Sequence, residues 1–321
     1  MARVKPMERK GAAVCPASCG ELVQGTWNGV NFLVPCPIDL YSQAVVKLRP
    51  GTGLSGPSGR PKALEAVRRT LNFLGSPELG GELWLDSSIP RGKGMASSTA
   101  DIGAAASATA AALGVALQPR DLLTLAVGIE PTDGTLLPGV TLVDHVRGFW
   151  QLPLGKGPEA GILALDLGGQ VDTLEFNAQP GLAEKNRENE PFTRQAFLLV
   201  RRGIQEKNLV LLGQGATLSA EANQSVLLKP LLSELKEWSR RRGGAGIVAA
   251  HSGTVLGLIY PPGRDLEKEE ERLRRDFPAT GASWQVRLIQ GGVKVVNTNA
   301  AAWRELAVSQ GTVRGLGVPG F

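Results

Sequence analysis

The chain has 321 residues, of which 42% are hydrophobic, enough for a packed core in each of two domains. It contains no run of about 18 apolar residues and no apolar segment behind its charged N-terminus, so we expect no membrane partner, no signal peptide and a cytoplasmic location. The net charge of +5 comes from interspersed basic and acidic residues, which predicts no nucleic-acid partner and fits a polyphosphate ligand equally well.

Cysteine and histidine are rare. The cysteines Cys15, Cys19 and Cys36 are odd in number and lack a second pair for a zinc site, so we interpret them as reduced thiols. His145 and His251 are the only histidines and lie far apart in the sequence. A His-rich metal centre or a Ser/His/Asp hydrolase is therefore not expected.

Apolar periodicity predicts helices and strands in both halves, which indicates an α+β fold. Residues 11–50 are expected to be extended, residues 61–74 to form a helix with a proline in its first turn, and residues 82–85 to form a strand. The helix predicted at residues 101–117 is almost pure alanine. Because small side chains let neighbouring backbone approach closely, we expect this helix to be central and tightly surrounded.

A polar, charged segment at residues 180–192 separates the two halves, and we place the boundary there, giving domains 1–185 and 186–321. The second half has its own patterns, with helices at residues 193–202, 209–223, 225–241 and 265–277 and strands at residues 247–250, 254–260 and 284–289. The sequence contains no internal repeat.

The loop before the alanine-rich helix predicts an anion-binding site. Gly92 and Gly94 remove side chains so that backbone N–H groups can converge on phosphate oxygens, and the helix start adds positive potential. Consecutive hydroxyls can bind phosphate or magnesium, and Lys93 can supply a point charge. We therefore predict that ATP contacts Pro90, Gly92, Lys93, Gly94, Met95, Ala96, Ser97, Ser98 and Thr99.

A simpler interpretation makes Ser98 the N-cap of the helix and Asp101 its capping-box partner, a device worth on the order of 1 kcal/mol. It accounts for these two residues, but not for Gly92, Gly94 and the consecutive hydroxyls. We therefore favour phosphate binding.

The motifs resemble those of the GHMP kinases. Residues 90–100 are similar to the family's second motif, P-x-G-x-G-L-G-S-S-A, with Met-Ala in place of Leu-Gly. Residues 15–25, CPASCGELVQG, resemble the first motif of homoserine kinase, and the third motif is matched more weakly by residues 243–246 and 251–254. Together with EPTDG at residues 130–134, they look most like the family's L-threonine kinases of cobalamin biosynthesis, the group that includes the propanediol-operon kinase.

The resemblance implies ATP and Mg²⁺ as cofactors and L-threonine as the small-molecule substrate, with O-phospho-L-threonine as the precursor of the aminopropanol linker of cobalamin. It implies a ribosomal-protein-S5-like N-terminal domain and a ferredoxin-like C-terminal domain, with the active site between them. A monomer or homodimer is expected.

The resemblance also suggests roles for single residues. Ser98 and Glu130 would hold magnesium, and Asp133 would orient or deprotonate the substrate hydroxyl. Glu21 would meet the substrate ammonium, and Ser18 lies in the substrate site where mevalonate kinase has a lysine. The plain alternatives are that Asp133 is a turn residue and Glu130 a solvated loop charge.

Two other functions stay open. The first is a homoserine kinase or another small-molecule kinase of the family. Its acceptor differs from threonine by little more than a methyl group, which changes the binding free energy by only ~1 to 3 kcal/mol. A catalytically silent regulator that binds nucleotide or nucleic acid is the alternative from another class. The presence of Ser98, Glu130 and Asp133 argues against that alternative.

Overall fold

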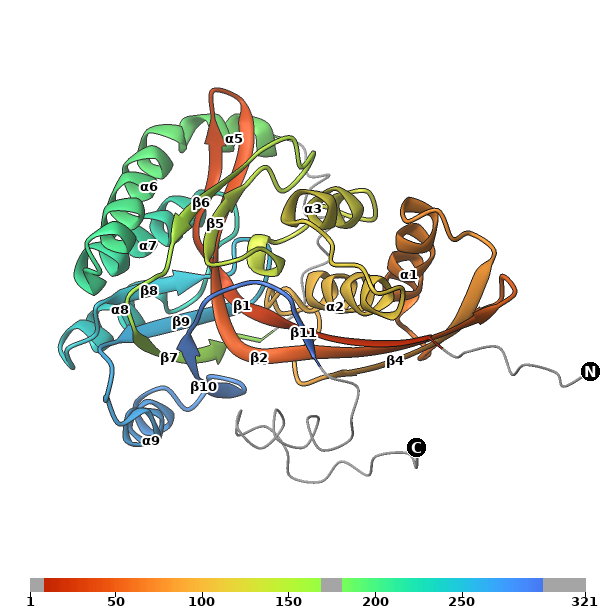
Figure 1. Cartoon of the computed structure of the whole chain (residues 1–321). Coiled ribbons are helices and arrows are strands. Elements are labelled where there is room, and N and C mark those ends of the chain that lie inside the picture. The colour runs from red at the N-terminus through yellow and green to blue at the C-terminus, as the bar shows by residue number, and fades with distance from the viewer. Residues whose placement is uncertain (1–8, 169–180, 297–321) are drawn as a thin grey trace, which may run out of the picture.

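The computed structural model describes residues 9–168 and 181–296. Helices and strands occur in both halves, which confirms the predicted α+β class (Figure 1). The described strands form one sheet in the order β11-β1-β8-β9-β7-β10-β2-β4-β3, and the β5–β6 hairpin joins it at β2. These strands are β1 (Arg9–Trp27), β2 (Val30–Pro50), β3 (Leu54–Ser55), β4 (Leu79–Ser87), β5 (Val140–Val143), β6 (Gln151–Gly155), β7 (Ala160–Asp166), β8 (Gly246–Ala249), β9 (Val255–Tyr260), β10 (Ser283–Leu288) and β11 (Lys294–Val296).

The two longest strands, β1 and β2, form an antiparallel hairpin that reaches through both halves of the molecule (Figure 1). Its ladder is interrupted by register shifts between Ser18 and Glu21 and again between Glu21 and Val23. Bulges of this kind redirect side chains and end regular pairing. At this point β1 also meets β8, with Glu21 opposite Ala249, so the irregular part of β1 lies where the two halves join.

Helices cover the sheet in two groups. In the first half, α2 packs on β1 and β2, and α1 and α3 lie against α2 (Figure 1). In the second half, α6 and α7 pack together and α7 lies on β8. Helix α8 contacts β8 and β9, and α9 contacts β7 and β10. The helices are α1 (Pro61–Phe73), α2 (Ser97–Ala112), α3 (Pro119–Val127), α5 (Leu182–Glu188), α6 (Glu190–Gln205), α7 (Leu209–Ala222), α8 (Leu232–Arg240) and α9 (Leu266–Asp276), with 3-10 turns η1 (Gly134–Leu136) and η2 (Asn223–Ser225).

The alanine-rich helix α2 is central and tightly surrounded, as predicted. Its residues from Thr99 to Ala110 are all buried. Gly11 of β1 approaches it so closely that an added Cβ would overlap the backbone of Ala108 and Ala112. The small side chains of α2 therefore let the sheet and the helix pack almost backbone to backbone.

Several predicted boundaries differ from the structure. The helix predicted at residues 101–117 begins earlier, at Ser97, and ends before Gly114, whose positive φ of 75° stops it. The helix predicted at residues 225–241 is reduced to α8, because Pro230 lies inside the predicted range and a proline cannot continue a helix interior.

The domain boundary between residues 185 and 186 stays a prediction. The larger hydrophobic cluster contains side chains from both predicted domains, such as Ala13 of β1 and Ile259 of β9, and a smaller cluster lies around Trp238 of α8. The connection predicted at residues 180–192 is mostly helical instead: it holds α5 and the start of α6, and only residue 180 lies outside the described residues. No helix in the described ranges is long and apolar enough to cross a membrane.

Candidate active site

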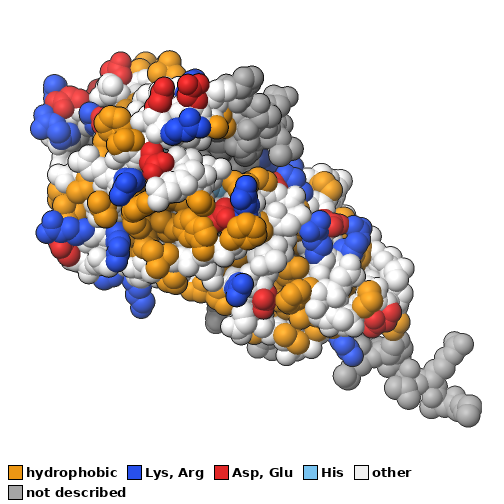
Figure 2. Space-filling view, turned by 90° about the horizontal axis from the view of Figure 1, so that it is seen from above, with side chains coloured by type: hydrophobic (Ala, Val, Ile, Leu, Met, Phe, Trp, Pro, Cys, Tyr) orange, Lys and Arg blue, Asp and Glu red, His pale blue; other side chains and the backbone are white. Residues whose placement is uncertain are grey.

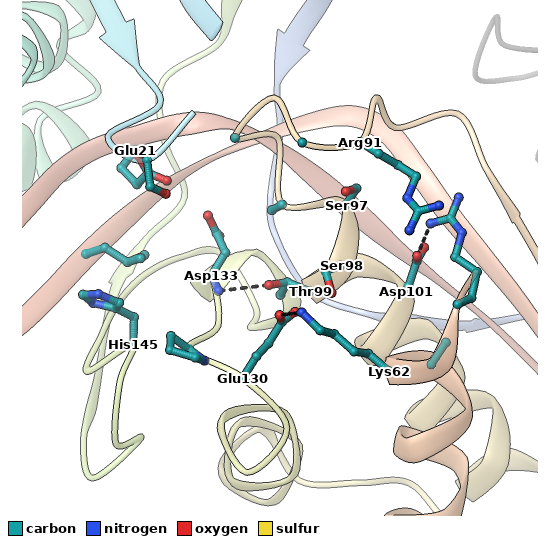
Figure 3. Close-up of a pocket in the computed structure, with 18 of the residues that line it drawn as sticks. Glu21, Lys62, Arg91, Ser97, Ser98, Thr99, Asp101, Glu130, Asp133 and His145 are labelled. Atoms are coloured by element: carbon teal, nitrogen blue, oxygen red, sulfur yellow. Dashed lines mark hydrogen bonds and ion pairs between the residues drawn. The ribbon is translucent and has the colours of Figure 1, made fainter. Parts of the chain in front are cut away.

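A cavity of about 560 Å³ opens among the start of α1, the start of α2 and the bulged part of β1 (Figure 3). Its volume is in the range of small-molecule sites. One end, which we call the acidic end, is lined by Glu21, Asp133 and His145. The other, which we call the cationic end, is lined by Lys62, Arg91, Ser97 and Ser98, and by Arg60, which forms an ion pair with Asp101.

The start of α2 faces the cavity without a side-chain cap. The N-cap residue is Ala96, in a left-handed conformation with φ 57°, and no side chain accepts a hydrogen bond from the first turn. The capping-box interpretation of Ser98 and Asp101 is therefore wrong: Asp101 accepts a hydrogen bond from Ser42 Oγ at 2.6 Å and forms an ion pair with Arg60. An uncapped helix start presents free N–H groups and a positive dipole end to an anion.

The two predicted loop glycines serve different purposes. Gly92 has a φ of 68° and open space around it, so a close ligand can approach its backbone. Gly94 has a φ of 81°, and a Cβ there would overlap Ala250 and Gly253. Gly94 therefore lets the phosphate loop pack against the 251–254 turn, which places the predicted second and third motifs in contact.

Three residues of the predicted ATP loop do not line the cavity. Lys93 directs its Nζ to Asp166 of β7 at 2.7 Å, and its carbonyl accepts hydrogen bonds from the N–H groups that open β9. Met95 is buried, and its carbonyl accepts a hydrogen bond from Ser18 N at 3.2 Å. Pro90 also lies outside the lining. Lys93 and Met95 therefore anchor the loop to the sheet.

The positive charge at the cationic end comes instead from residues that the sequence analysis missed. Arg60 is the N-cap residue of α1, Lys62 lies in the first turn, and Arg91 donates a hydrogen bond to Gly59 O at 2.9 Å. Basic side chains at the start of a helix oppose its dipole, at a cost of ~0.3 to 1 kcal/mol each. This unfavourable placement, beside a predicted helix start at Pro61, was the available signal for an anion site.

Glu130 lies at the cationic end, close to Ser98 and Thr99 (Figure 3). Its carboxylate forms an ion pair with Lys62 of α1, and its side chain is only 14% exposed. Glu130 is therefore not a solvated loop charge. A largely buried carboxylate beside a hydroxyl provides hard oxygen donors of the kind that magnesium binds.

Asp133 is held by the same helix start. Its backbone N–H donates to Thr99 Oγ1 at 3.1 Å, and its Oδ1 accepts a hydrogen bond from Thr135 N at 2.8 Å. The Thr99 hydroxyl thus positions the loop. Burial raises the pKa of Asp133 well above its ordinary value, and the charge of Glu21 raises it further.

Glu21 reaches the acidic end from the bulged part of β1. Its Oε2 accepts hydrogen bonds from His251 N at 2.7 Å and from His251 Nδ1 at 3.1 Å. Because His251 Nδ1 also lies 3.1 Å from the carbonyl of Ala249, this nitrogen carries the proton. On the far side of the ring, Nε2 lies 2.9 Å from Ser219 Oγ of α7, so His251 fixes the position of Glu21 from behind.

Ser18, the other predicted substrate contact, is buried and does not line the cavity. Its Oγ donates to Gly20 O at 2.5 Å and accepts a hydrogen bond from Cys36 N at 3.0 Å. It therefore stabilises the bulge that directs Glu21 into the cavity.

The cysteines are free thiols, as predicted, and burial is the main cause that raises the pKa of Cys19 to about 12.

Comparison with known proteins identifies the family. The GHMP kinases N terminal domain matches residues 61–136, and the GHMP kinases C terminal domain matches residues 200–279. The chain is 37% identical to an L-threonine kinase of Salmonella typhimurium, over 88% of this chain and 95% of that protein. It is 36% identical to an L-threonine kinase of Citrobacter freundii, over 78% of this chain and 87% of that protein.

Solved structures agree on the fold. Homoserine kinase from Cytophaga hutchinsonii superimposes with a TM-score of 0.64 at 19% identity, covering 92% of this chain and all of that chain. Mevalonate diphosphate decarboxylase from Staphylococcus aureus gives 0.68 at 15% identity, covering 91% and 99%. From the matched domains and the two relatives, we conclude that the chain belongs to the GHMP kinase family.

Proposed function

We propose that this chain transfers the γ-phosphoryl group of ATP to the hydroxyl of L-threonine, giving O-phospho-L-threonine. The observation that carries the proposal is that one cavity joins an uncapped helix start with the carboxylates of Glu21 and Asp133. The helix start suits a triphosphate, and the carboxylates suit the ammonium and hydroxyl of an amino acid. The names of the two sequence relatives supply threonine as the amino acid.

The cationic end fits ATP and magnesium. The start of α2 offers backbone N–H groups, and Arg60, Lys62 and Arg91 offer positive charge to the phosphates. Ser98 and Glu130 would hold the magnesium ion. The described residues contain no cluster of His, Cys, Asp and Glu that could hold a metal alone, which suits an ion that takes most of its ligands from water and phosphate. When bound, magnesium would neutralise charge on the transferred group.

The acidic end would position the amino acid. Phosphoryl transfer forms a bond from the threonine oxygen to the γ-phosphorus, breaks the bond to the β,γ-bridging oxygen and releases the hydroxyl proton. We assign Asp133 to orient this hydroxyl and accept its proton, a task for which a raised pKa is favourable. Glu21, fixed by His251, would pair with the substrate ammonium.

The test is a coupled assay with magnesium, ATP and a panel of amino acids and alcohols, with mass spectrometry of the product. We expect phosphothreonine, with a kcat/KM for threonine well above that for homoserine. Comparable turnover of homoserine would make the chain a homoserine kinase or a broader kinase of the family. The role of the product in the aminopropanol linker of cobalamin remains a prediction from the resemblance.

Absence of turnover with every acceptor would favour the silent regulator. On the face seen in Figure 2, Lys and Arg side chains are dispersed among acidic and apolar ones, which gives no support to nucleic-acid binding there. Nucleic-acid affinity that drops steeply with salt, without kinase turnover, would support that alternative.

A further inference from the structure

An amino acid brings a carboxylate into the acidic end of the cavity, where Glu21 and Asp133 already supply negative charge. The cationic lining residues Lys62 and Arg91 lie at the other end (Figure 3), and Arg60 joins them there through its ion pair with Asp101. A substrate carboxylate that lies near other carboxylates needs a hydrogen-bond donor, because the free energy lost on burying it unpaired exceeds the free energy gained from its other contacts. The question is which residue at the acidic end can donate.

His145 lies at this end on the turn between β5 and β6, and its ring lines the cavity (Figure 3). Its Nδ1 is buried and has no hydrogen-bond partner among the described residues. Buried polar atoms nearly always have a partner, so an unpaired ring nitrogen on a residue that lines a cavity points to a partner that the ligand supplies. The imidazole is not used by any step of the phosphoryl transfer proposed above.

The backbone around His145 is firmly held. Its carbonyl accepts a hydrogen bond from Thr132 N at 2.8 Å, which ties the turn to the loop that carries Asp133. Oδ1 of Asp144 accepts hydrogen bonds from Val146 N at 3.2 Å and Arg147 N at 3.0 Å, which closes the turn itself. The backbone that carries the ring is therefore positioned relative to Asp133 before substrate binds, as a specificity contact requires.

The protonation state of His145 suits this task. Burial lowers its pKa to about 4, against the opposing influence of Glu21 and Asp144, so the ring is neutral near pH 7. A permanently charged lysine or arginine here would pair with Glu21 or Asp133 and compete with the substrate ammonium. A neutral imidazole can donate one N–H to the substrate without neutralising the carboxylates that the reaction needs.

We propose that His145 donates a hydrogen bond to the α-carboxylate of the substrate, and that it thereby makes the site select amino acids over amino alcohols that lack this group. The proposal rests on the proposed function, and it adds the carboxylate-binding contact that Glu21 and Asp133 cannot provide.

The experiment compares two substrates that differ only in the carboxylate, L-threonine and (R)-1-amino-2-propanol. His145→Phe keeps a ring of similar size and removes the donor. We expect its kcat/KM for threonine to fall about 10- to 100-fold, mainly through KM, because hydrogen bonds to charged groups are lost at that scale. The kcat/KM for aminopropanol should change less than about threefold, and the KM for ATP should stay unchanged.

His145→Gln, which keeps a donor, should recover part of the loss. Val146→Ala is the matched control, because Val146 is the next residue of the turn and is exposed outside the cavity lining. Equal losses for both substrates in His145→Phe, or no loss for either, would overturn the proposal. Equal melting temperatures of the variants and wild type confirm that the comparison is made between folded proteins.

Failure of the proposed function gives a different result. If the wild-type enzyme prefers homoserine, threonine is the wrong acceptor, and the same comparison is made with homoserine and 3-amino-1-propanol. If the wild-type enzyme turns over no acceptor, calorimetric titration with threonine and with aminopropanol still measures the contribution of His145 to carboxylate binding. Equal affinities of wild type and His145→Phe for threonine would then overturn the proposal.

Discussion

Replacing Asp133 with asparagine should lower activity and raise stability at the same time. The substitution keeps an oxygen that accepts the hydrogen bond from Thr135 N, but it removes the charge that burial and Glu21 make unfavourable. If Asp133 accepts the hydroxyl proton, turnover should fall by ~10² to 10⁴, the range typical of general-base removal. A loss of less than about tenfold would indicate that Asp133 only contacts the substrate and that positioning dominates catalysis.

The stability change follows from the raised pKa of Asp133. Below the unfolded pKa of ~3.9 the carboxyl is protonated in both the folded and the unfolded state. As the pH rises from there through the folded pKa, the free energy of unfolding of the wild type falls by ~1.4 kcal/mol for each unit by which the folded pKa exceeds the unfolded pKa. Asparagine does not titrate, so the variant should melt higher than wild type at pH 8, by ~1.5 °C per kcal/mol for a chain of 321 residues, and the difference should vanish near pH 4. Scanning calorimetry across this range provides the measurement. A variant that melts no higher than wild type at pH 8 would refute the argument from burial.

Further predictions address the loop, the metal ligand and the residue behind Glu21. Glu130→Ala should raise the magnesium concentration needed for half-maximal activity, and excess magnesium should restore part of the activity. Asp133→Asn should leave the magnesium dependence unchanged, and a magnesium titration with the opposite result would exchange the two assigned roles. Gly94→Val and Gly92→Val should both lower the melting temperature, because each places a β-branched residue at a positive φ. The loss should be larger for Gly94→Val, whose side chain also overlaps Ala250 and Gly253, and Gly92→Val should in addition weaken ATP binding. Calorimetry and the KM for ATP measure the two effects, and equal melting temperatures of the two variants would contradict this packing. His251→Leu should raise the KM for threonine about tenfold or more without changing the KM for ATP, because Glu21 loses its Nδ1–H donor. Unchanged kinetics for threonine would show that Glu21 needs no such support.

Local patterns in the sequence predicted several features of this molecule. The alanine-rich segment predicted a central helix because only small side chains permit the close approach of β1 that the structure contains. The glycine and hydroxyl residues before this helix predicted a phosphate loop. Such a loop needs a flexible backbone and an uncapped helix start, and both depend on residues that are neighbours in the sequence. Glu130 and Asp133, predicted together, both line the cavity that this loop helps to form.

What the sequence could not determine depends on residues that lie far apart in the chain. The hydrogen bond from His251 to Glu21 joins residues 230 positions apart, and the ion pair of Lys62 with Glu130 joins residues 68 positions apart. Periodicity and motif spacing describe only neighbours, so neither pairing has a local signature. By itself, the sequence predicted most helices, several strands and the loop that suits phosphate, but not helix α5 or strands β5, β6 and β7. Only the tertiary structure decided that Lys93 pairs with Asp166 and that Gly94 packs against Gly253, because the folding of the sheet alone brings these groups into contact.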